Sequence, residues 1–332
     1  MSIKKENSII KKSFIFITKW RSLPFYELIS YFFMFASVPM LANGIRPYNN
    51  EIIKIILFTI LTLYTGFFAT LIWNDITDAD IDAIAHPDRP IPSGRINKKK
   101  FFKIALIFSV FNFIFAILIS IWCFIIVGLT ALFVAFHNKY LKRTIKLPAY
   151  SEIFGPFQWI VVVIFGFLAI WTALPVNSEI SINFPFFGGI FTSSKAIEQM
   201  IILIIFTYFA DTSHDIAEGI HDAEADLLHG VKTYATTFGK ENAAKISMIM
   251  FIVSGILGII LFLRSILSPI FLCIFLLLFS YTIFYPLRLL KSNNQEIEKQ
   301  GTTVGRKLYD YFLLTYDILF IDLIIQIFIF NI

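Results

Sequence analysis

The sequence of 332 residues contains little charge, because Asp, Glu, Lys and Arg together make up 15% of it, against ~25% in an average soluble protein. Hydrophobic residues make up 57%, and 39 residues are phenylalanine. One soluble core could not bury this much apolar surface, so the composition excludes a water-soluble globular protein and also a disordered chain. The composition therefore indicates a membrane protein.

Cysteine is also scarce. Cys123 and Cys273 are the two cysteines, and each lies inside an apolar run without C-x-x-C spacing. This pattern excludes a disulfide framework and a thiolate metal site. We expect no cleavable signal peptide, because the first twenty residues are basic and mixed rather than apolar.

Nine apolar runs approach the ~17–25 residues with which a helix crosses a bilayer. The sequence therefore predicts an all-α membrane protein with nine transmembrane helices, in a single domain over 26–332 that follows a basic tail over 1–25. The sixth run is short, and the third and fourth almost merge. The runs are Tyr26–Leu41, Ile52–Trp73, Phe102–Ile119, Ile121–Phe136, Ile153–Leu174, Ile197–Ala210, Ala244–Leu263, Leu267–Leu287 and Tyr311–Phe330.

The basic residues predict the orientation of these helices. If the runs alternate in direction, 24 of the 28 Lys and Arg residues fall on one side, which the positive-inside rule assigns to the cytoplasm. We therefore expect a multi-pass protein with a cytoplasmic amino terminus. The net charge of +5 is then mostly a topology signal, and it gives little support to nucleic-acid binding.

The acidic residues are concentrated in two stretches, which together hold eleven of the 23. The first continues the second apolar run and includes Asp75, Asp78, Asp80, Asp82 and Asp88. On a helix, Asp75, Asp78 and Asp82 would share one face, whereas Asp80 would point elsewhere. The charge count places this stretch at the cytoplasmic side.

The second stretch continues the sixth run on the same predicted side. Asp211, Asp215, Glu218, Asp222 and Asp226 step by three or four residues, so one helix face would carry five carboxylates. Like charges at this spacing each cost a few tenths of a kcal/mol, and a cation should offset them.

Two facing acidic rows predict a site for Mg²⁺ and a diphosphate, because Mg²⁺ takes one or two carboxylates together with phosphate oxygens. Solvated helix ends are the simpler alternative, but they would not require in-register rows. A zinc or iron site is a rival hypothesis, since His214 and His221 lie seven residues apart on the acidic helix. No H-E-x-x-H spacing accompanies them.

Basic residues that could bind phosphate follow each acidic stretch. Arg89 lies in a loop that Pro87, Pro90 and Pro92 stiffen, and Lys232 follows the second stretch in a Gly-Val-Lys-Thr sequence. Arg suits bidentate phosphate contacts, and Lys provides a mobile point charge.

These motifs resemble the signatures of the UbiA superfamily of membrane prenyltransferases. The first is similar to the family's N-D-x-x-D-x-x-x-D sequence with its D-R-P-I-P-S-G-R tail, and the second to D-x-x-D-x-x-x-D followed by G-x-K/R-T. The matching residues are Asn74, Asp75, Asp78, Asp82, the run 88–95, Asp222, Asp226, Gly230 and 231–233, and Tyr140-Leu141-Lys142-Arg143 looks like the family's basic stretch.

The resemblance implies nine helices around a central cavity, two Mg²⁺ ions held by the acidic motifs, and transfer of a prenyl group, geranylgeranyl-like in size, from its diphosphate to a hydrophobic acceptor in the bilayer. The implied catalytic residues are Asp75, Asp78, Asp222 and Asp226. Asn74 and Asp82 complete the implied metal ligands, and the implied diphosphate contacts are Asn74, Arg89, Lys142, Arg143 and Lys232.

One position departs from the family pattern. Gly219 stands where the second signature begins with Asp, and Glu218 or Asp215 could replace the missing metal ligand. An aromatic ring can stabilise the allylic cation left after diphosphate departs, and Phe157 and Trp159 are candidates.

These motifs are compatible with several functions. The acceptor could be an ether lipid, a chlorin or an aromatic quinone precursor, and a terpene cyclase of the same fold would capture the cation within one molecule. A divalent-cation transporter is a less favoured alternative, because its acids should lie near mid-membrane. The D-x-x-D-G-x-x-A-R run of CDP-alcohol phosphotransferases is absent.

Overall fold

The computed structural model describes residues 24–85, 87–141, 144–174, 179–293 and 296–330, and most of them are helical. The elements are α2 (Phe25–Asn43), α3 (Asn50–Thr77), α4 (Ala79–Ala85), α5 (Lys98–Ile119), α6 (Ile121–Phe136), η1 (His137–Leu141), α8 (Tyr150–Phe154), α9 (Phe157–Ala173), β1 (Ile180–Phe184), β2 (Gly188–Thr192), α10 (Ser194–His229), α11 (Tyr234–Phe238), α12 (Lys240–Arg264), α13 (Pro269–Thr282), α14 (Phe284–Leu290) and α15 (Ile297–Phe330).

Seven helical segments among the described residues are long and apolar enough to cross a membrane. A shorter apolar helix, α6, adds an eighth candidate, whereas α15 is not one of the seven. The protein is therefore a multi-pass membrane protein, but the predicted count of nine spans is not confirmed. The seven segments are Phe25–Asn43, Asn50–Thr77, Lys98–Ile119, Tyr150–Ala173, Ser194–Glu224, Lys240–Arg264 and Pro269–Leu290.

Local capping explains several helix boundaries. The break between α5 and α6, where two apolar runs almost merge, falls at Ser120, which is extended and whose hydroxyl accepts a hydrogen bond from the Cys123 N–H at 3.1 Å. Ser193 caps α10 in the same way. The predicted sixth run was too short, because α10 continues past Ala210 to His229 and carries the whole second acidic stretch on one helix.

A β-hairpin interrupts the otherwise helical chain between α9 and α10. Ile180 pairs with Thr192 and Phe184 with Gly188 in antiparallel register. The all-α prediction missed it, although the alternating sequence Ile-Ser-Ile-Asn-Phe over 180–184 is typical of a strand. The Trp122 ring packs edge-on against Phe184, with centroids 4.7 Å apart, and attaches the hairpin to α6.

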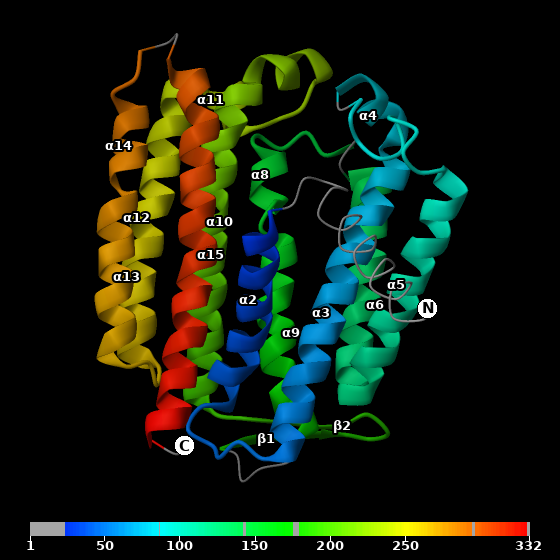
Figure 1. Ribbon diagram of the computed structural model, residues 1–332, viewed down its shortest axis with the longest axis vertical. Coiled ribbons are helices and arrows are strands. Elements are labelled where there is room, and N and C mark those ends of the chain that lie inside the picture. The colour runs from blue at the N-terminus through cyan, green and yellow to red at the C-terminus, as the bar shows by residue number, and fades with distance from the viewer. Residues whose placement is uncertain (1–23, 86, 142–143, 175–178, 294–295, 331–332) are drawn as a thin grey trace, which may run out of the picture.

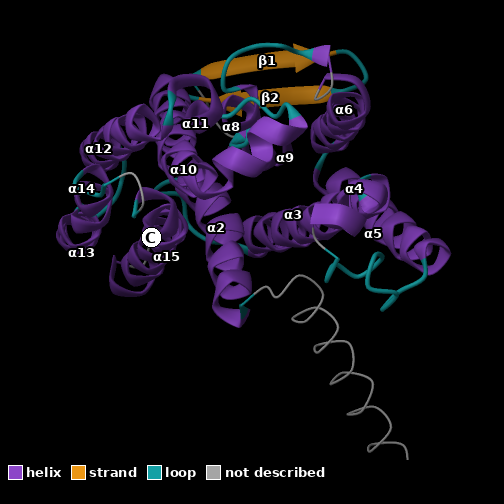
Figure 2. Cartoon of the chain, turned by 90° about the horizontal axis from the view of Figure 1, so that it is seen from above, coloured by secondary structure: helices purple, strands orange, loops and turns teal. Residues whose placement is uncertain are grey.

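The helices form two groups joined by α2 and α9 (Figure 2). One group contains α10, α12, α13, α14 and α15, and the other contains α3, α5 and α6. Helix α9 contacts α2, α3, α6 and α10, so it connects the two groups through the middle of the bundle. The hairpin lies at one end, and α4, α8 and α11 lie towards the other (Figure 1).

Candidate active site

The first acidic stretch lies where α3 gives way to α4. Helix α3 ends at Thr77, and the Asp78 N–H still donates to the Asn74 carbonyl at 2.9 Å. Asp82 N–H in turn donates to the Asp78 carbonyl at 2.8 Å, so one turn still separates the two acids. Asp75 and Asp82 are buried and Asp80 is exposed, in agreement with the predicted division. The break at Asp78 itself was not predicted.

Arg89 folds back onto this stretch. Its Nη1 lies 2.7 Å from Asp82 Oδ1, and the Asp82 carboxylate is buried whereas the guanidinium is partly exposed. The second carboxylate oxygen, Asp82 Oδ2, is buried without a hydrogen-bond partner among the described residues. Sequence reasoning assigned Asp82 to metal and Arg89 to diphosphate as separate contacts. The structure pairs them directly.

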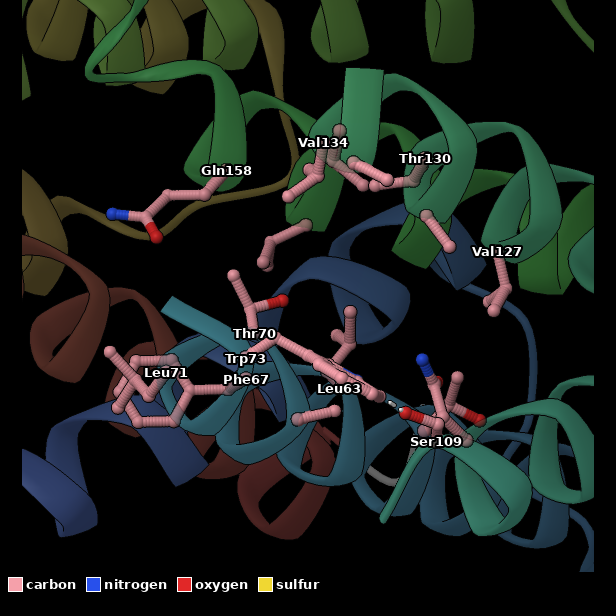
Figure 3. Close-up of a pocket in the computed structure, with 18 of the residues that line it drawn as sticks. Leu63, Phe67, Thr70, Leu71, Trp73, Ser109, Val127, Thr130, Val134 and Gln158 are labelled. Carbon is pink, nitrogen blue, oxygen red and sulfur yellow. Dashed lines mark hydrogen bonds between the residues drawn. The ribbon is translucent and has the colours of Figure 1, made fainter. Parts of the chain in front are cut away.

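An apolar cavity of about 770 Å³ leads away from Asp78. Side chains of α3, α5, α6 and α9 line most of it, and Asp78, Thr77 and Lys98 lie among the lining residues near the end of α3. Figure 3 shows Leu63 and Thr70 on one side of this space and Thr130 and Val134 on the other. The volume lies within the ~300–1,000 Å³ of ligand pockets.

The cavity is elongated along α3. Thr62 and Asp78 both line it, and they lie sixteen residues apart, which corresponds to about 24 Å along a helix. The predicted aromatic candidates, Phe157 and Trp159, also line it. The Trp159 ring is held by Tyr31, with ring centroids 5.4 Å apart. An extended apolar chain with a charged head at Asp78 would match this shape.

His214 lies among the carboxylates of the second acidic stretch. Its Nε2 lies 3.1 Å from Asp211 Oδ1 and 3.3 Å from Asp215 Oδ1, and its Nδ1 lies 3.9 Å from Glu218. Asp211, His214 and Asp215 have the spacing of a possible metal group. His214 Nε2 thus lies within reach of both carboxylates and can hydrogen-bond to them, whereas His221 is exposed.

The outer end of α10 carries the remaining acids. Asp222 is exposed and Asp226 is half-buried. The helix ends at His229, and the positive φ of 70° at the following Gly230 allows the chain to turn back. The exposed Lys232 then places its Nζ 3.2 Å from the Lys146 carbonyl. Lys142 and Arg143, two of the predicted diphosphate contacts, lie outside the described residues.

The two acidic stretches end at the same end of the bundle, where α4 and α11 follow them (Figure 1). They belong to different helix groups, and α9 packs against both α3 and α10. The prediction that both stretches share one side of the bundle therefore agrees with the fold.

Sequence reasoning missed Glu152 on α8. This residue is 5% exposed, and its Oε2 accepts a hydrogen bond from the Tyr234 N–H at the start of α11. The signal in the sequence was weak, because Glu152 is a single acid just before the fifth apolar run.

Most of the chain matches one known protein family. The UbiA prenyltransferase family model matches residues 30–302, which is most of the chain. The chain belongs to the UbiA prenyltransferase family. The expected resemblance, carried by the two acidic motifs, is thereby confirmed.

Among curated relatives in this family, the digeranylgeranylglyceryl phosphate synthase of Saccharolobus solfataricus is 29% identical over 180 residues. The match covers 54% of this chain and 55% of the relative, so the chain spans little more than half of that protein's length.

Solved UbiA structures share the fold. The apo structure of a UbiA homologue from Aeropyrum pernix K1 aligns with a TM-score of 0.66 at 17% identity, over 92% of this chain and 100% of that one. A UbiA homologue from Archaeoglobus fulgidus, bound to GPP and Mg²⁺, aligns with a TM-score of 0.50 at 15% identity, over 87% and 97% of the two chains. At these identities the likeness concerns the fold.

Proposed function

We propose that the protein is a Mg²⁺-dependent intramembrane prenyltransferase that moves a geranylgeranyl-like group from its diphosphate to a lipid acceptor. The observation that carries this proposal is the cavity, because its apolar length meets the first acidic motif at Asp78. A prenyl diphosphate has the same division, with an apolar chain and an anionic head. The diphosphate would lie at Asp78 and the chain along α3.

The residues of the first acidic motif, which reaches the cavity at Asp78, fit Mg²⁺. They offer hard oxygen ligands, and the buried Oδ2 of Asp82 has no hydrogen-bond partner among the described residues. The UbiA homologue solved with GPP and Mg²⁺ supports the same choice of ion. We assign the metal ligands to Asn74, Asp75, Asp78, Asp82, Asp222 and Asp226, with Asp215 and Glu218 as the further candidates of the second stretch.

Bound Mg²⁺ would neutralise the charge that builds on the departing diphosphate. The chain's own cations add to this effect. Arg89 already lies against Asp82 and would need only to reorient its remaining N–H groups towards phosphate oxygens, and Lys232 would supply a second charge from the α10 side. Lys142 and Arg143 remain predicted diphosphate contacts.

The apolar walls would serve the second half of the reaction. When the prenyl carbon–oxygen bond breaks, its electron pair leaves with the diphosphate, and an allylic cation remains. Phe67, Trp73 and Trp159 line the cavity and would present ring faces to this cation while they exclude water. The acceptor oxygen would then bind the prenyl carbon and lose its proton.

We propose a prenylated glyceryl phosphate as the acceptor. The curated relatives are digeranylgeranylglyceryl phosphate synthases, whose name describes a glyceryl phosphate that carries two prenyl chains. A lipid of this kind would approach the cytoplasmic end of the bundle through the bilayer, with its phosphate towards the basic loops.

Mass spectrometry of products tests this proposal. Purified protein would receive labelled geranylgeranyl diphosphate, Mg²⁺ and, in parallel, geranylgeranylglyceryl phosphate, a chlorin alcohol precursor or an aromatic quinone precursor. We expect labelled product only with the glyceryl phosphate lipid, and none after EDTA treatment. A labelled hydrocarbon formed without any acceptor would indicate a cyclase, and unchanged diphosphate in every arm would refute prenyl transfer.

A further inference from the structure

Gly219, which takes the place of an aspartate in the second acidic motif, adjoins a carboxylate from another helix. A Cβ atom built on Gly219 would lie 2.7 Å from Glu152 Oε1 and 3.8 Å from its Cδ. Contacts below 3.0 Å are essentially absent for real Cβ atoms. The Glu152 carboxylate therefore occupies the volume into which a side chain at position 219 would begin, and the two cannot coexist without a shift.

The Glu152 carboxylate is buried and only half satisfied. Its Oε2 accepts from the Tyr234 N–H, but Oε1 has no hydrogen-bond partner among the described residues. Burial of an unpartnered carboxyl oxygen is unfavourable, so a ligand at this position would remove a real cost. Oε1 is also the atom that lies next to Gly219.

Helix α8 is fixed in this place by the loop that follows the second motif. The Ser151 N–H donates to the Lys232 carbonyl at 3.2 Å, and the Ala149 N–H donates to Thr237 Oγ1 at 3.3 Å. Together with the Tyr234 contact, these bonds tie α8 to the segment that carries Lys232. Glu152 is thus positioned by the motif's own loop, although 67 residues separate it from Gly219 in sequence.

Other carboxylates converge on the same place. Asp215 Oδ2 is the closest atom to a Cβ built on Gly155, at the end of α8, and the charges of Asp215 and Asp226 both act on the Glu152 carboxylate. His214 pairs with Asp215, but no ion pair is formed by Glu152 among the described residues. The carboxylates of Glu152, Asp215 and Asp226 would together bind a cation favourably.

We propose that Glu152 supplies the carboxylate that Gly219 lacks, so that the metal ligand of the second motif comes from α8 instead of the first motif position on α10. This inference rests on the proposed function for the identity of the ion as Mg²⁺. Glu152 thus takes the role of substitute ligand in place of Glu218. The Glu218 side chain is 54% exposed, and its backbone packs against Gly305 of α15.

Metal binding by the purified full-length protein tests the proposal separately from catalysis. Mn²⁺, a spectroscopic substitute for Mg²⁺, would be titrated without prenyl diphosphate and the free ion measured by electron paramagnetic resonance. Glu152→Gln keeps an oxygen that can accept from the Tyr234 N–H, so it preserves this hydrogen bond and removes the carboxylate. We expect at least a ~10-fold loss of affinity at one site, with an unchanged melting temperature.

A double variant tests whether a carboxylate at position 219 can replace the one at position 152. Glu152→Ala with Gly219→Asp returns the carboxylate to α10 and vacates the space that Asp would need, so it should recover most of the lost affinity. Gly219→Asp alone should not improve binding, because both carboxylates would compete for one volume. Glu198→Gln is the matched control, since Glu198 lies near the opposite end of α10 and pairs with Arg264.

The outcomes separate the two proposals. Wild-type affinity in Glu152→Gln, no measurable Mn²⁺ binding by the wild type, or failure of the double variant to recover affinity would overturn the role of Glu152, whatever the prenyl transfer activity. Binding that depends on Glu152 in a protein that consumes no prenyl diphosphate would support the metal site and refute the proposed function instead.

Discussion

Asp78→Asn is the substitution that most sharply tests the head of the cavity. Asp78 is half-buried at the break between α3 and α4 and lines the cavity, whereas Asp80, two residues later, is exposed. The amide keeps the size of the side chain and removes its charge. Because the turn at this position is held by the backbone N–H of residue 78, we expect the fold to survive.

The expected magnitude follows from the position of the charge. A unit charge ~4 Å from a cation contributes about 4 kcal/mol at an effective dielectric constant of ~20, which corresponds to roughly 1,000-fold in rate. Asp78 is only partly buried, so water screens some of this, and we expect a fall in turnover of ~100-fold, the lower end for loss of a group that stabilises transition-state charge.

Diphosphate release under saturating Mg²⁺ measures this effect, with thermal unfolding as the check on folding. Asp80→Asn provides the matched control, because it makes the same chemical change on the exposed side and should have a much milder effect. Equal losses in the two variants would refute the assignment of Asp78 to the site, as would a turnover in Asp78→Asn close to that of the wild type.

Three further predictions concern other parts of the molecule. Arg89→Ala should raise the KM for prenyl diphosphate. It should also lower the free energy of unfolding by about 1–3 kcal/mol, because Asp82 would remain buried without its partner. A wild-type melting temperature would argue against the Arg89–Asp82 ion pair. Gly166→Leu should lower the free energy of unfolding by about 1–3 kcal/mol, because a Cβ at Gly166 would lie 2.6 Å from Val38 Cγ1 of α2. An unchanged melting temperature would show that the α2–α9 contact is loose. Single cysteines placed at Lys99 and Asn183 should be labelled from the cytoplasm and from outside respectively, and cytoplasmic labelling at Asn183 would reverse the predicted orientation.

The sequence predicted the features that depend on neighbours along the chain. Apolar runs located α5 and α6 with their boundary at Ser120, and helical spacing set Asp80, which is exposed, apart from Asp75 and Asp82, which are buried. These are properties of helical periodicity and of capping, and they need no knowledge of the tertiary structure.

Features that depend on distant contacts could not be predicted in this way. The ion pair between Asp82 and Arg89 needs the course of the proline-containing loop, and the contact between Glu152 and Gly219 needs the packing of α8 on α10. Periodicity on α10 alone led to Glu218 and Asp215 as replacements, because it compares only residues of one helix.

Photoaffinity labelling with a substrate analogue tests whether the cavity holds the prenyl chain with its diphosphate at the acidic motifs. A geranylgeranyl diphosphate analogue with a diazirine at the far end of the chain would be irradiated with the protein and Mg²⁺, and labelled residues would be mapped by mass spectrometry. This binding mode predicts labels near Thr62, Val127 and Phe165, at the end of the cavity remote from Asp78, and their loss on competition with geranylgeranyl diphosphate. Labels confined to α12 and α13, or labels that the competitor does not reduce, would contradict it.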